Sequence, residues 1–399
     1  MARLALWLAL ANAVQLVLGM ARSVVLGRWL GVEAFGELGY ILALVTLADI
    51  AAQAGLSNIV TREVAAVPGR DGRIFGASLA LRTAMVVVMG AVVWALVGPW
   101  AALMLLGTVG QLGVSVIRAK LLRGPQIAAN LLPGSLAVAG VLACAAVAKP
   151  SAGVAIAALA LAGAAASAGQ LLIAGASLKG KLSAGMRVAA ALLRESWPLW
   201  LSEILIVTFS RMSVLMLRWL QPGSAGNESI GYFQIAYTLT EGGNFVLGAL
   251  VMVTFPMMSA MRNAPAGRLK YVLGKAMRFG LLAGGGAMVA QLALGSPVVR
   301  ILYGSEYSPA VPALMAMAPI LPLAVVNGVL ATLLVAAGLQ VWVLAFNVVF
   351  LAFNALANFW AIRAFGFTGA AAVTTATNSI AFALFWWKTG FLRRGGRMT

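Results

Sequence analysis

Four arginines stand inside long apolar stretches or at their ends, where a charge is expensive. They are Arg22, Arg28, Arg211 and Arg218. A guanidinium group is planar and can bond two phosphate oxygens at once, so these side chains suit an anion such as a diphosphate. Arg211 and Arg218 are spaced to share one helical face. We expect the four to line a common cationic cavity. The alternative is that they reach the membrane interface or pair with internal carboxylates.

Three carboxylates occupy comparable positions: Asp49, Glu203 and Glu241. A charge in a membrane-spanning helix costs about 2.5–3.5 kcal/mol on insertion scales, so it indicates a functional site by default. These side chains have two readings. They bind and release a coupling ion, or they serve only as partners of the arginines. The second reading suits a carrier driven by the membrane potential.

Amide side chains form polar stripes on the same stretches. Asn347, Asn354 and Asn358 share one stripe, Asn244 follows Glu241, and Gln53 follows Asp49. These amides are candidate polar groups of the cavity. Asparagine commonly joins membrane helices by hydrogen bonds, and that structural reading is favoured for the longest stripe.

The composition excludes several classes of function. The chain has no histidine and one cysteine, so histidine bases, histidine–metal sites and an internal disulfide are ruled out. We expect no metal, no cofactor and no enzymatic activity. The net charge of +18 does not indicate nucleic-acid binding, because the basic residues alternate with apolar stretches instead of forming one patch.

The elements that position these side chains are membrane-spanning helices. Of 399 residues, 62% are hydrophobic and 10% charged. About 20 apolar residues cross a bilayer, and the pattern predicts an all-α protein of about twelve spans near 4–24, 36–57, 76–97, 100–117, 131–148, 154–174, 198–218, 231–255, 277–295, 311–335, 341–361 and 368–390. Lysine and arginine concentrate in every second gap, which predicts that both termini are cytoplasmic.

The spans divide into two related halves. We expect six-helix lobes at 1–178 and 197–399, joined by an amphipathic cytoplasmic segment at 179–196. The run Arg28-Trp29-Leu30 in the first half has a counterpart, Arg218-Trp219-Leu220, in the second. An even number of spans per repeat gives parallel repeats about an axis along the membrane normal. The pairs Gly27/Gly31 and Gly280/Gly284 are expected to be close-packing sites.

Several short motifs carry a resemblance to a known family, in a consistent order along nearly the whole chain. They are Arg22 followed by Arg28-Trp29-Leu30-Gly31, Phe35-Gly36, Gly55-Leu56 and Arg62-Glu63-Val64-Ala65, then Ile301 to Tyr307 with Ala310, and finally Asn354, Asn358 and Phe365 to Ala371. Together they resemble bacterial Wzx-type polysaccharide flippases, a group within the MATE-like MOP superfamily.

The resemblance implies two six-helix lobes that alternate access to a cavity, and movement of a polyprenyl-diphosphate-linked oligosaccharide from the cytoplasmic to the outer leaflet. It implies a multi-pass protein of the bacterial inner membrane. Its partners would be the lipid-linked sugar, membrane lipid, and the polysaccharide polymerase and assembly proteins. The alternatives are a drug exporter or lipid II flippase of the same fold, a membrane glycosyltransferase or ligase, and a scaffold without transport.

Overall fold

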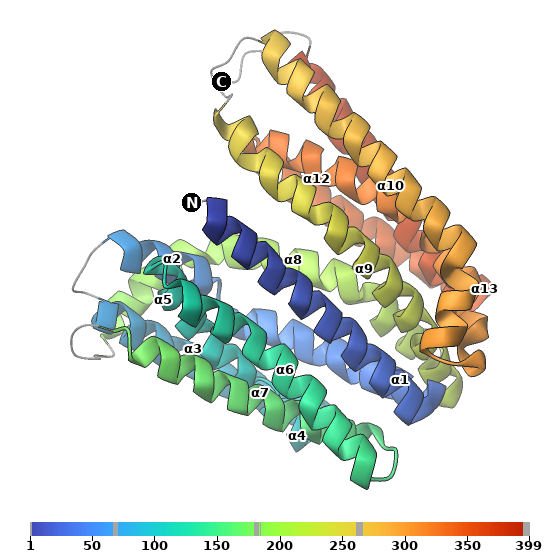
Figure 1. Cartoon of the computed structure of the whole chain (residues 1–399), viewed down its shortest axis with the longest axis horizontal. Helices are drawn as coiled ribbons and strands as arrows, with labels where there is room; N and C mark the ends of the chain where they lie inside the picture. The colour runs from blue at the N-terminus through green and yellow to red at the C-terminus, as the bar shows by residue number, and fades with distance from the viewer. Residues whose placement is uncertain (1, 67–70, 179–182, 184, 261–265, 394–399) are drawn as a thin grey trace. The chain divides into compact units, whose positions relative to one another are not determined.

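The structure is a computed structural model that describes residues 2–66, 71–178, 183, 185–260 and 266–393. Every regular element in this part of the chain is helical (Figure 1). The chain divides into two compact units, Met1–Thr208 and Phe209–Thr399, so that the long helix α8 contributes to both. The predicted lobe boundaries stay a prediction, since most of residues 179–184 lies outside the described residues.

The first unit contains seven helices and the beginning of an eighth. They are α1 (Ala2–Gln53), α2 (Leu56–Ala66), α3 (Asp71–Val97), α4 (Pro99–Leu103), α5 (Leu106–Ala119), α6 (Arg123–Val147), α7 (Ala152–Gly175) and α8 (Met186–Leu220). Helix α7 packs against both α5 and α6, and α1 packs against α6 and α3 (Figure 1). Leu56, Val60, Phe75 and Leu112 belong to a buried cluster that ties α2, α3 and α5 together.

The segment that opens α8 packs on this same cluster. Leu192 is buried in it, and Val188 and Leu193 lie against it. Leu193 falls within the segment 179–196, which the sequence indicates is amphipathic. In the structure that side chain contacts the protein core, so packing within the first unit accounts for its apolar character.

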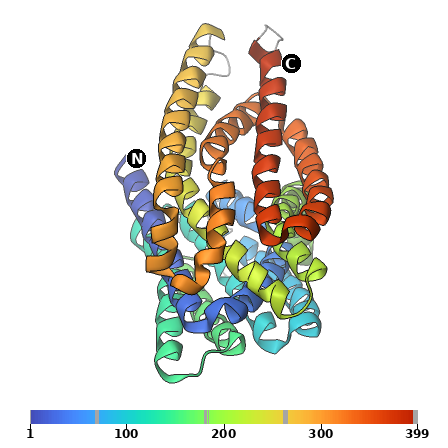
Figure 2. The same ribbon diagram turned by 90° about the vertical axis from the view of Figure 1, so that its right-hand side faces the viewer.

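The second unit contains the rest of α8 and five further α-helices with one short 3₁₀ helix. They are α9 (Ser224–Ala260), α10 (Ala266–Leu302), η1 (Ser305–Ala310), α11 (Val311–Met317), α12 (Ile320–Ala336) and α13 (Gln340–Arg393). Helices α9 and α10 run side by side in Figure 2, and both pack against α12. Leu330, Phe346, Phe350 and Phe385 belong to the core between α12 and α13.

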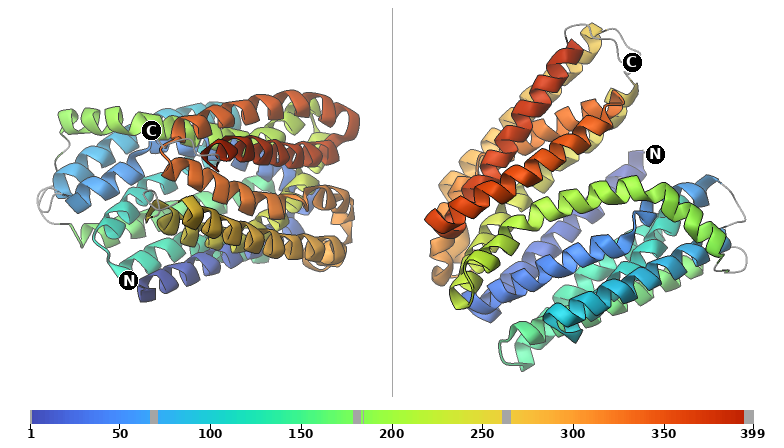
Figure 3. Two further views of the ribbon diagram at one scale, coloured as in Figure 1. Left: turned by 90° about the horizontal axis from the view of Figure 1, so that it is seen from above. Right: turned by 180° about the vertical axis from the view of Figure 1, so that it is seen from behind.

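Two of the helices are sharply kinked at a glycine. Gly31 in α1 has φ 73° and ψ 175°, and Gly366 in α13 has φ 59° and ψ −139°. These conformations are almost exclusive to glycine. Beyond Gly366 the chain turns back, so that α13 forms two arms (Figure 3). Gly31 is therefore a bend, and the expectation that it is a close-packing site is wrong.

The other predicted glycine pair does mark close packing. A Cβ atom on Gly280 would lie 2.6 Å from Val325 Cγ1, and one on Gly284 would lie 2.5 Å from the Cα of Pro322. No side chain fits at those distances. Helix α10 thus approaches α12 through these two positions, as the sequence indicates.

The described residues contain eight helices long and apolar enough to cross a membrane, or nine if η1–α11 and α12 count as one bent span. We expected twelve. The difference has a physical reason, because the two kinked helices each count once. The stretch that contains α1 runs for 57 residues, on through α2, and that of α13 runs for 50, each more than twice the length of one crossing. The later part of α9 has side chains outside the described residues and does not enter the count.

Candidate functional site: a polar cavity in the first unit

A cavity of about 340 Å³ lies among α1, α5, α6 and α7 of the first unit. Arg22, Thr46 and Asp49 of α1 line it together with Thr108 and Gln111 of α5. The other lining residues are Leu42, Val45, Met104, Gly107, Pro133, Gly163, Ala166 and Gln170. Two of the residues that the sequence singles out, Arg22 and Asp49, thus line the same cavity.

Asp49 is held in place by hydrogen bonds to both of its oxygens. Gln53 Nε2 donates to Oδ2 at 2.8 Å, one helical turn further along α1. Thr108 Oγ1 donates to Oδ1 from α5. Charge-assisted hydrogen bonds of this kind are stronger than those between neutral groups. The two residues of this short polar stripe are thus hydrogen-bonded, which fixes the carboxylate at the cavity wall.

Arg82 of α3 lies behind this wall and is fully buried. Its Nη1 donates to the carbonyl of Thr108 at 3.0 Å, and its Nη2 donates to the carbonyl of Gln53 at 2.9 Å and to Ser57 Oγ at 3.2 Å. Gln53 ends α1, so its carbonyl has no donor within the helix. Arg82 supplies that donor and joins the end of α1 to α5.

The end of α1 receives a second donor from α8. Trp200 Nε1 donates to the carbonyl of Ile50 at 3.1 Å. Beyond these carbonyls the chain turns through Ala54 and Gly55, which have positive φ angles of 50° and 62°. A Cβ atom on Gly55 would lie 2.9 Å from the carbonyl oxygen of Ser196, so α8 packs directly on the turn. The last turn of α1, which carries Asp49, is therefore fixed from two sides.

Arg22 faces the cavity without a fixed partner. Within the described part of the chain we find no hydrogen bond or ion pair to its guanidinium, and Asp49 is bonded to Thr108 and Gln53 instead. The alternative reading, in which Arg22 pairs with an internal carboxylate, is not seen among the described residues. Its five N–H donors remain available to a ligand.

The far wall of the cavity depends on a close approach of α5 to α7. A Cβ atom on Gly110 would lie 2.4 Å from Gln170 Oε1 and 2.5 Å from the Cα of Ser167. Glycine is therefore required at this position. Gln170 Nε2 donates to the carbonyl of Ala129 at 2.8 Å, which fixes this amide between α7 and α6.

Arg211 and Glu241 belong to the second unit and have separate surroundings. Arg211 Nε is buried and has no hydrogen-bond partner among the described residues. Glu241 accepts a hydrogen bond from Tyr237 Oη at 2.8 Å, and no ion pair joins it to Arg211 in the part of the chain that the structure describes. Asn244 Oδ1 is likewise buried without a donor. A shared cavity for Arg22 and Arg211 stays a prediction.

The asparagine stripe of α13 forms a buried network. Asn358 Nδ2 donates to Asn354 Oδ1 at 2.8 Å and to Ser213 Oγ of α8 at 3.3 Å. Asn354 Nδ2 donates to Thr377 Oγ1 at 3.2 Å, across the two arms of α13. These bonds join helices, as we expected for the stripe. Asn347 is half-buried on the same helix and makes none of these bonds.

The remaining candidates lie away from the cavity. Arg218 Nη1 donates to the carbonyl of Gly223 at 3.0 Å and to Asn227 Oδ1 at 2.9 Å, so it ties the end of α8 to the start of α9. Arg28 is exposed on α1. Glu203 is half-buried on α8, close enough to Arg82 for their charges to interact.

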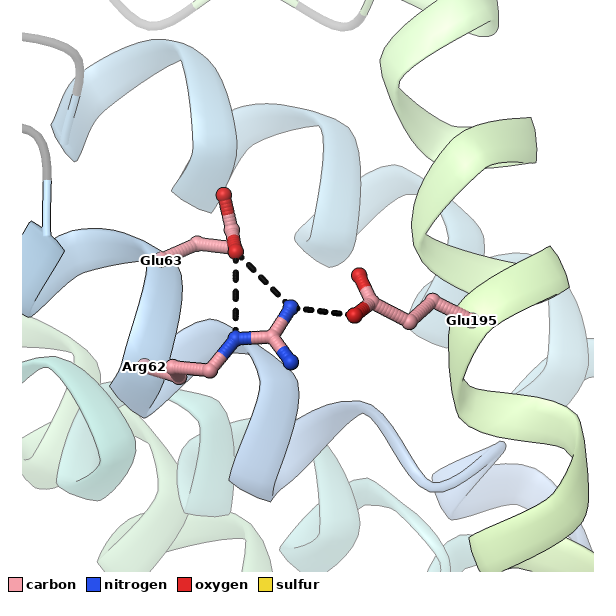
Figure 4. A network of polar contacts seen from close by, with 3 residues as sticks. All are labelled: Arg62, Glu63 and Glu195. Atoms are coloured by element: carbon pink, nitrogen blue, oxygen red, sulfur yellow. Dashed lines mark hydrogen bonds and ion pairs between the residues drawn. The ribbon is translucent and has the colours of Figure 1, made fainter.

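A separate ionic network lies at the surface of the first unit. Arg62 of α2 contacts Glu63 at 2.9 Å and reaches Glu195 of α8 with the same guanidinium (Figure 4). The three side chains are largely exposed, so their attraction is screened by water and salt. This network links α2 to α8 but does not contribute to the cavity.

Sequence reasoning missed three important polar residues of this site. Arg82 stands within the predicted span 76–97, where an arginine is as costly as those at the other positions we selected, so the signal was present. Thr108 and Gln111 gave no such signal, since hydroxyl and amide side chains are common in membrane helices. Their importance appears only once α5 is placed against α1.

The family model for polysaccharide biosynthesis proteins matches residues 1–262, which include every residue of the cavity. The chain belongs to this family. The family resemblance inferred from the sequence motifs is confirmed, and the chain is a membrane protein of polysaccharide biosynthesis. No curated protein matches it by sequence.

Solved structures with the same fold are transporters. "Lipid II flippase MurJ, inward closed conformation" superposes with a TM-score of 0.76 at 13% identity, covering 96% of this chain and 87% of that one. An inward-facing multidrug resistance MATE family transporter gives 0.71 at 14% identity, covering 96% of each chain. A Vibrio cholerae MATE transporter gives 0.64 at 15% identity, covering 100% of this chain and 98% of that one. At such low identity the likeness shows a common fold.

Proposed function

We propose that this family member is a flippase that moves a polyprenyl-diphosphate-linked oligosaccharide from the cytoplasmic to the outer leaflet of the bacterial inner membrane. The observation that carries the proposal is the match to the polysaccharide biosynthesis family on a fold shared with a lipid II flippase. The family supports a sugar-containing substrate, and the shared fold supports transport across the bilayer.

The physical problem for such a substrate is its headgroup. Sugar hydroxyls and a diphosphate cannot enter hydrocarbon without a large loss of hydration energy. A polar interior shelters them while the lipid tail stays in the bilayer. The cavity lined by Arg22 and Asp49, and Arg211 with its buried Nε, supply polar groups that could serve this purpose. An inside-negative potential favours outward movement of an anion by about 2.3 kcal/mol per charge per 100 mV.

We further propose twelve membrane crossings with both termini in the cytoplasm. The kinked helices α1 and α13 then cross twice each, and α9 crosses once. The exposed apolar side chains of α3 and α10 support a lipid-facing surface: Val87 is 65% and Leu282 is 77% exposed. Soluble proteins rarely expose apolar surfaces of this kind, so we propose that these side chains face lipid.

The competing functions differ in what they require. A drug exporter for cations needs an acidic and aromatic cavity, whereas this cavity is lined by one arginine, Arg22, as well as by Asp49, and has no aromatic lining among the described residues. A glycosyltransferase or ligase needs catalytic residues in a sizeable outer loop, and the connections between the described helices are short. A lipid II flippase would differ from the proposed flippase only in the sugar of its substrate. A transport assay with defined lipid-linked sugars distinguishes these two functions.

The test is reconstitution of the purified protein in vesicles with defined lipid-linked sugars, scoring the fraction that reaches the other leaflet. Arg211→Ala should reduce flipping at least tenfold, since losing one charge-assisted contact is worth about 1.4 kcal/mol or more. Arg211→Lys should restore part of the rate, because it keeps the charge but not the bidentate geometry.

Arg300→Ala is the matched control, since Arg300 is exposed at the end of α10. It should flip like the wild type. If the wild-type protein moves none of the lipid-linked sugars, the proposed function is wrong. If it moves them and Arg211→Ala is unaffected, the diphosphate is bound elsewhere.

A further inference from the structure

The charges around the cavity of the first unit do not suit a diphosphate. One cation, Arg22, and one carboxylate, Asp49, line the same space, so their formal charges cancel. A diphosphate in a diester carries two negative charges, and it would meet the carboxylate as well as the arginine. Like charges brought together in a poorly hydrated space repel strongly. The balance of charge favours a ligand that is polar but uncharged.

The hydrogen-bonding groups of the cavity match hydroxyl groups. Arg22 offers donors with no partner among the described residues. Asp49 accepts one hydrogen bond at each oxygen, while a carboxylate has about four acceptor sites. Gln111 adds an amide that both donates and accepts, and its side chain has no hydrogen bond in the described part of the chain. A sugar ring presents several hydroxyls, each of which is a donor and an acceptor.

The size of the cavity limits the ligand to a small group. Its volume of about 340 Å³ is near the lower end of the roughly 300–1,000 Å³ seen for ligand pockets. Gly107 and Gly163 leave room in its wall, since a Cβ atom at either would meet its nearest neighbours only at 3.9–4.0 Å. This space fits one ring and not an oligosaccharide chain.

We infer that this cavity is a binding subsite for a single uncharged sugar residue of the transported headgroup, with the diphosphate held elsewhere. The inference rests on the proposed flippase function for the identity of the headgroup. Arg22 and Gln111 contact the sugar, and Asp49 accepts from its hydroxyls. Arg82 is a positioning residue, because it holds Thr108, one of the two donors that orient Asp49.

The test measures equilibrium binding of radiolabelled free galactose and free N-acetylglucosamine to the purified full chain, with unlabelled inorganic pyrophosphate as competitor. At least one sugar should bind the wild-type protein, and pyrophosphate should not displace it. Arg22→Leu and Gln111→Leu should each weaken binding about tenfold or more, the loss expected when sugar hydroxyls lose charged or paired partners. Arg118→Leu is the matched control, since Arg118 is exposed on α5.

Folding of each variant is checked by its elution as a single species in size-exclusion chromatography. Arg22→Lys should bind the sugar better than Arg22→Leu. Three results would overturn the inference. The first is that neither sugar binds the folded wild-type protein. The second is that both leucine variants bind the sugar as tightly as the control. The third is that pyrophosphate displaces the sugar from the wild-type protein and that this displacement requires Arg22. The proposed function fails separately. If the vesicle assay shows no flipping while sugar binding still depends on Arg22 and Gln111, the flippase proposal falls and the subsite stands.

Discussion

Arg82 shows how one buried arginine organises the cavity without facing it. Its guanidinium bonds the carbonyls of Gln53 and Thr108, which belong to different helices. Removing it leaves the carbonyl of Gln53, the last residue of α1, without that donor, and breaks the contact with the carbonyl of Thr108 in α5. An unsatisfied buried polar group costs about 1–3 kcal/mol, so the contribution of Arg82 is structural first and functional through Asp49.

We predict that Arg82→Leu lowers the free energy of unfolding by about 1–3 kcal/mol, since the carbonyl of Gln53 at the end of α1 loses its donor and the contact with α5 is lost. Arg82→Lys should recover only part, because an ammonium is compact and lacks the spread of the guanidinium fork. Thermal unfolding of the solubilised protein measures the change. Arg73→Leu, on the exposed face of the same helix, should unfold like the wild type. Equal stability of both leucine variants would show that Arg82 does not hold the helices together.

At this scale the sequence predicted some contacts and not others. The bond between Asp49 and Gln53, and the bonding of Asn354 to Asn358, follow from helical spacing alone. The partners Thr108 and Ser213 are 59 and 145 residues away along the chain from Asp49 and Asn358, so no local pattern predicts them. A hydrogen bond between two helices depends on how the helices pack, and the spacing of residues along one helix does not predict that packing.

Helices α1 and α13 owe their shape to single glycines. Gly31 and Gly366 adopt backbone angles that other residues rarely reach. The apolar pattern predicted two separate spans on either side of each glycine, at 4–24 and 36–57 and at 341–361 and 368–390. It did not predict that the helical structure continues on both sides with so little intervening loop. A kink of this kind depends on backbone geometry more than on hydropathy.

Gly31→Ala should destabilise the protein by about 1–3 kcal/mol, the cost of a side chain at such angles. The cause is purely backbone strain, since no atom lies within 4 Å of the position that a Cβ would take. Gly19→Ala on the same helix is the matched control. It has equal space and a helical backbone, so alanine there should be neutral or gain up to about 1 kcal/mol. Thermal unfolding compares the two, and equal effects would argue against strain at Gly31.

The molecule as a whole is two helical units that carry different polar sites. The cavity with Arg22 and Asp49 belongs to the first, and the asparagine network belongs to the second. The fold class and the family were predictable, because span length and motif order repeat along the entire chain. The cavity was not, since it requires α1, α5, α6 and α7 to converge.

The direction of insertion is testable on the intact protein. Basic residues in every second gap predict that fusions of a reporter after Gly180 and after Arg397 both report the cytoplasm. An enzyme active only in the cytoplasm and one active only outside provide the two readouts. A fusion after Lys149 should report the outer side and serves as the control. A report from outside at either of the first two sites would show that the number of crossings is wrong.

Energy coupling is a property of the whole transport cycle. Because Gln53 and Thr108 each donate a hydrogen bond to Asp49, we expect it to serve as a fixed hydrogen-bond acceptor and not as an ion carrier. In vesicles that hold a potential but no proton or sodium gradient, flipping should persist. Asp49→Asn should slow it without changing its dependence on ions. Flipping that stops when the gradients are removed, with the potential held, would show ion coupling.

The placement of Arg82 also bears on how the chain is made. Synthesis delivers the N-terminal segments first, so the end of α1 is in the membrane before α3 arrives. The carbonyl of Gln53 is then already present when Arg82 is inserted, while the carbonyl of Thr108 is synthesised only later. An arginine costs about 2.5–3.5 kcal/mol to insert alone. The hydrogen bond from Arg82 to Gln53 can therefore offset part of that insertion cost early. The hydrogen bond to Thr108 offsets more of it once α5 has been synthesised and inserted.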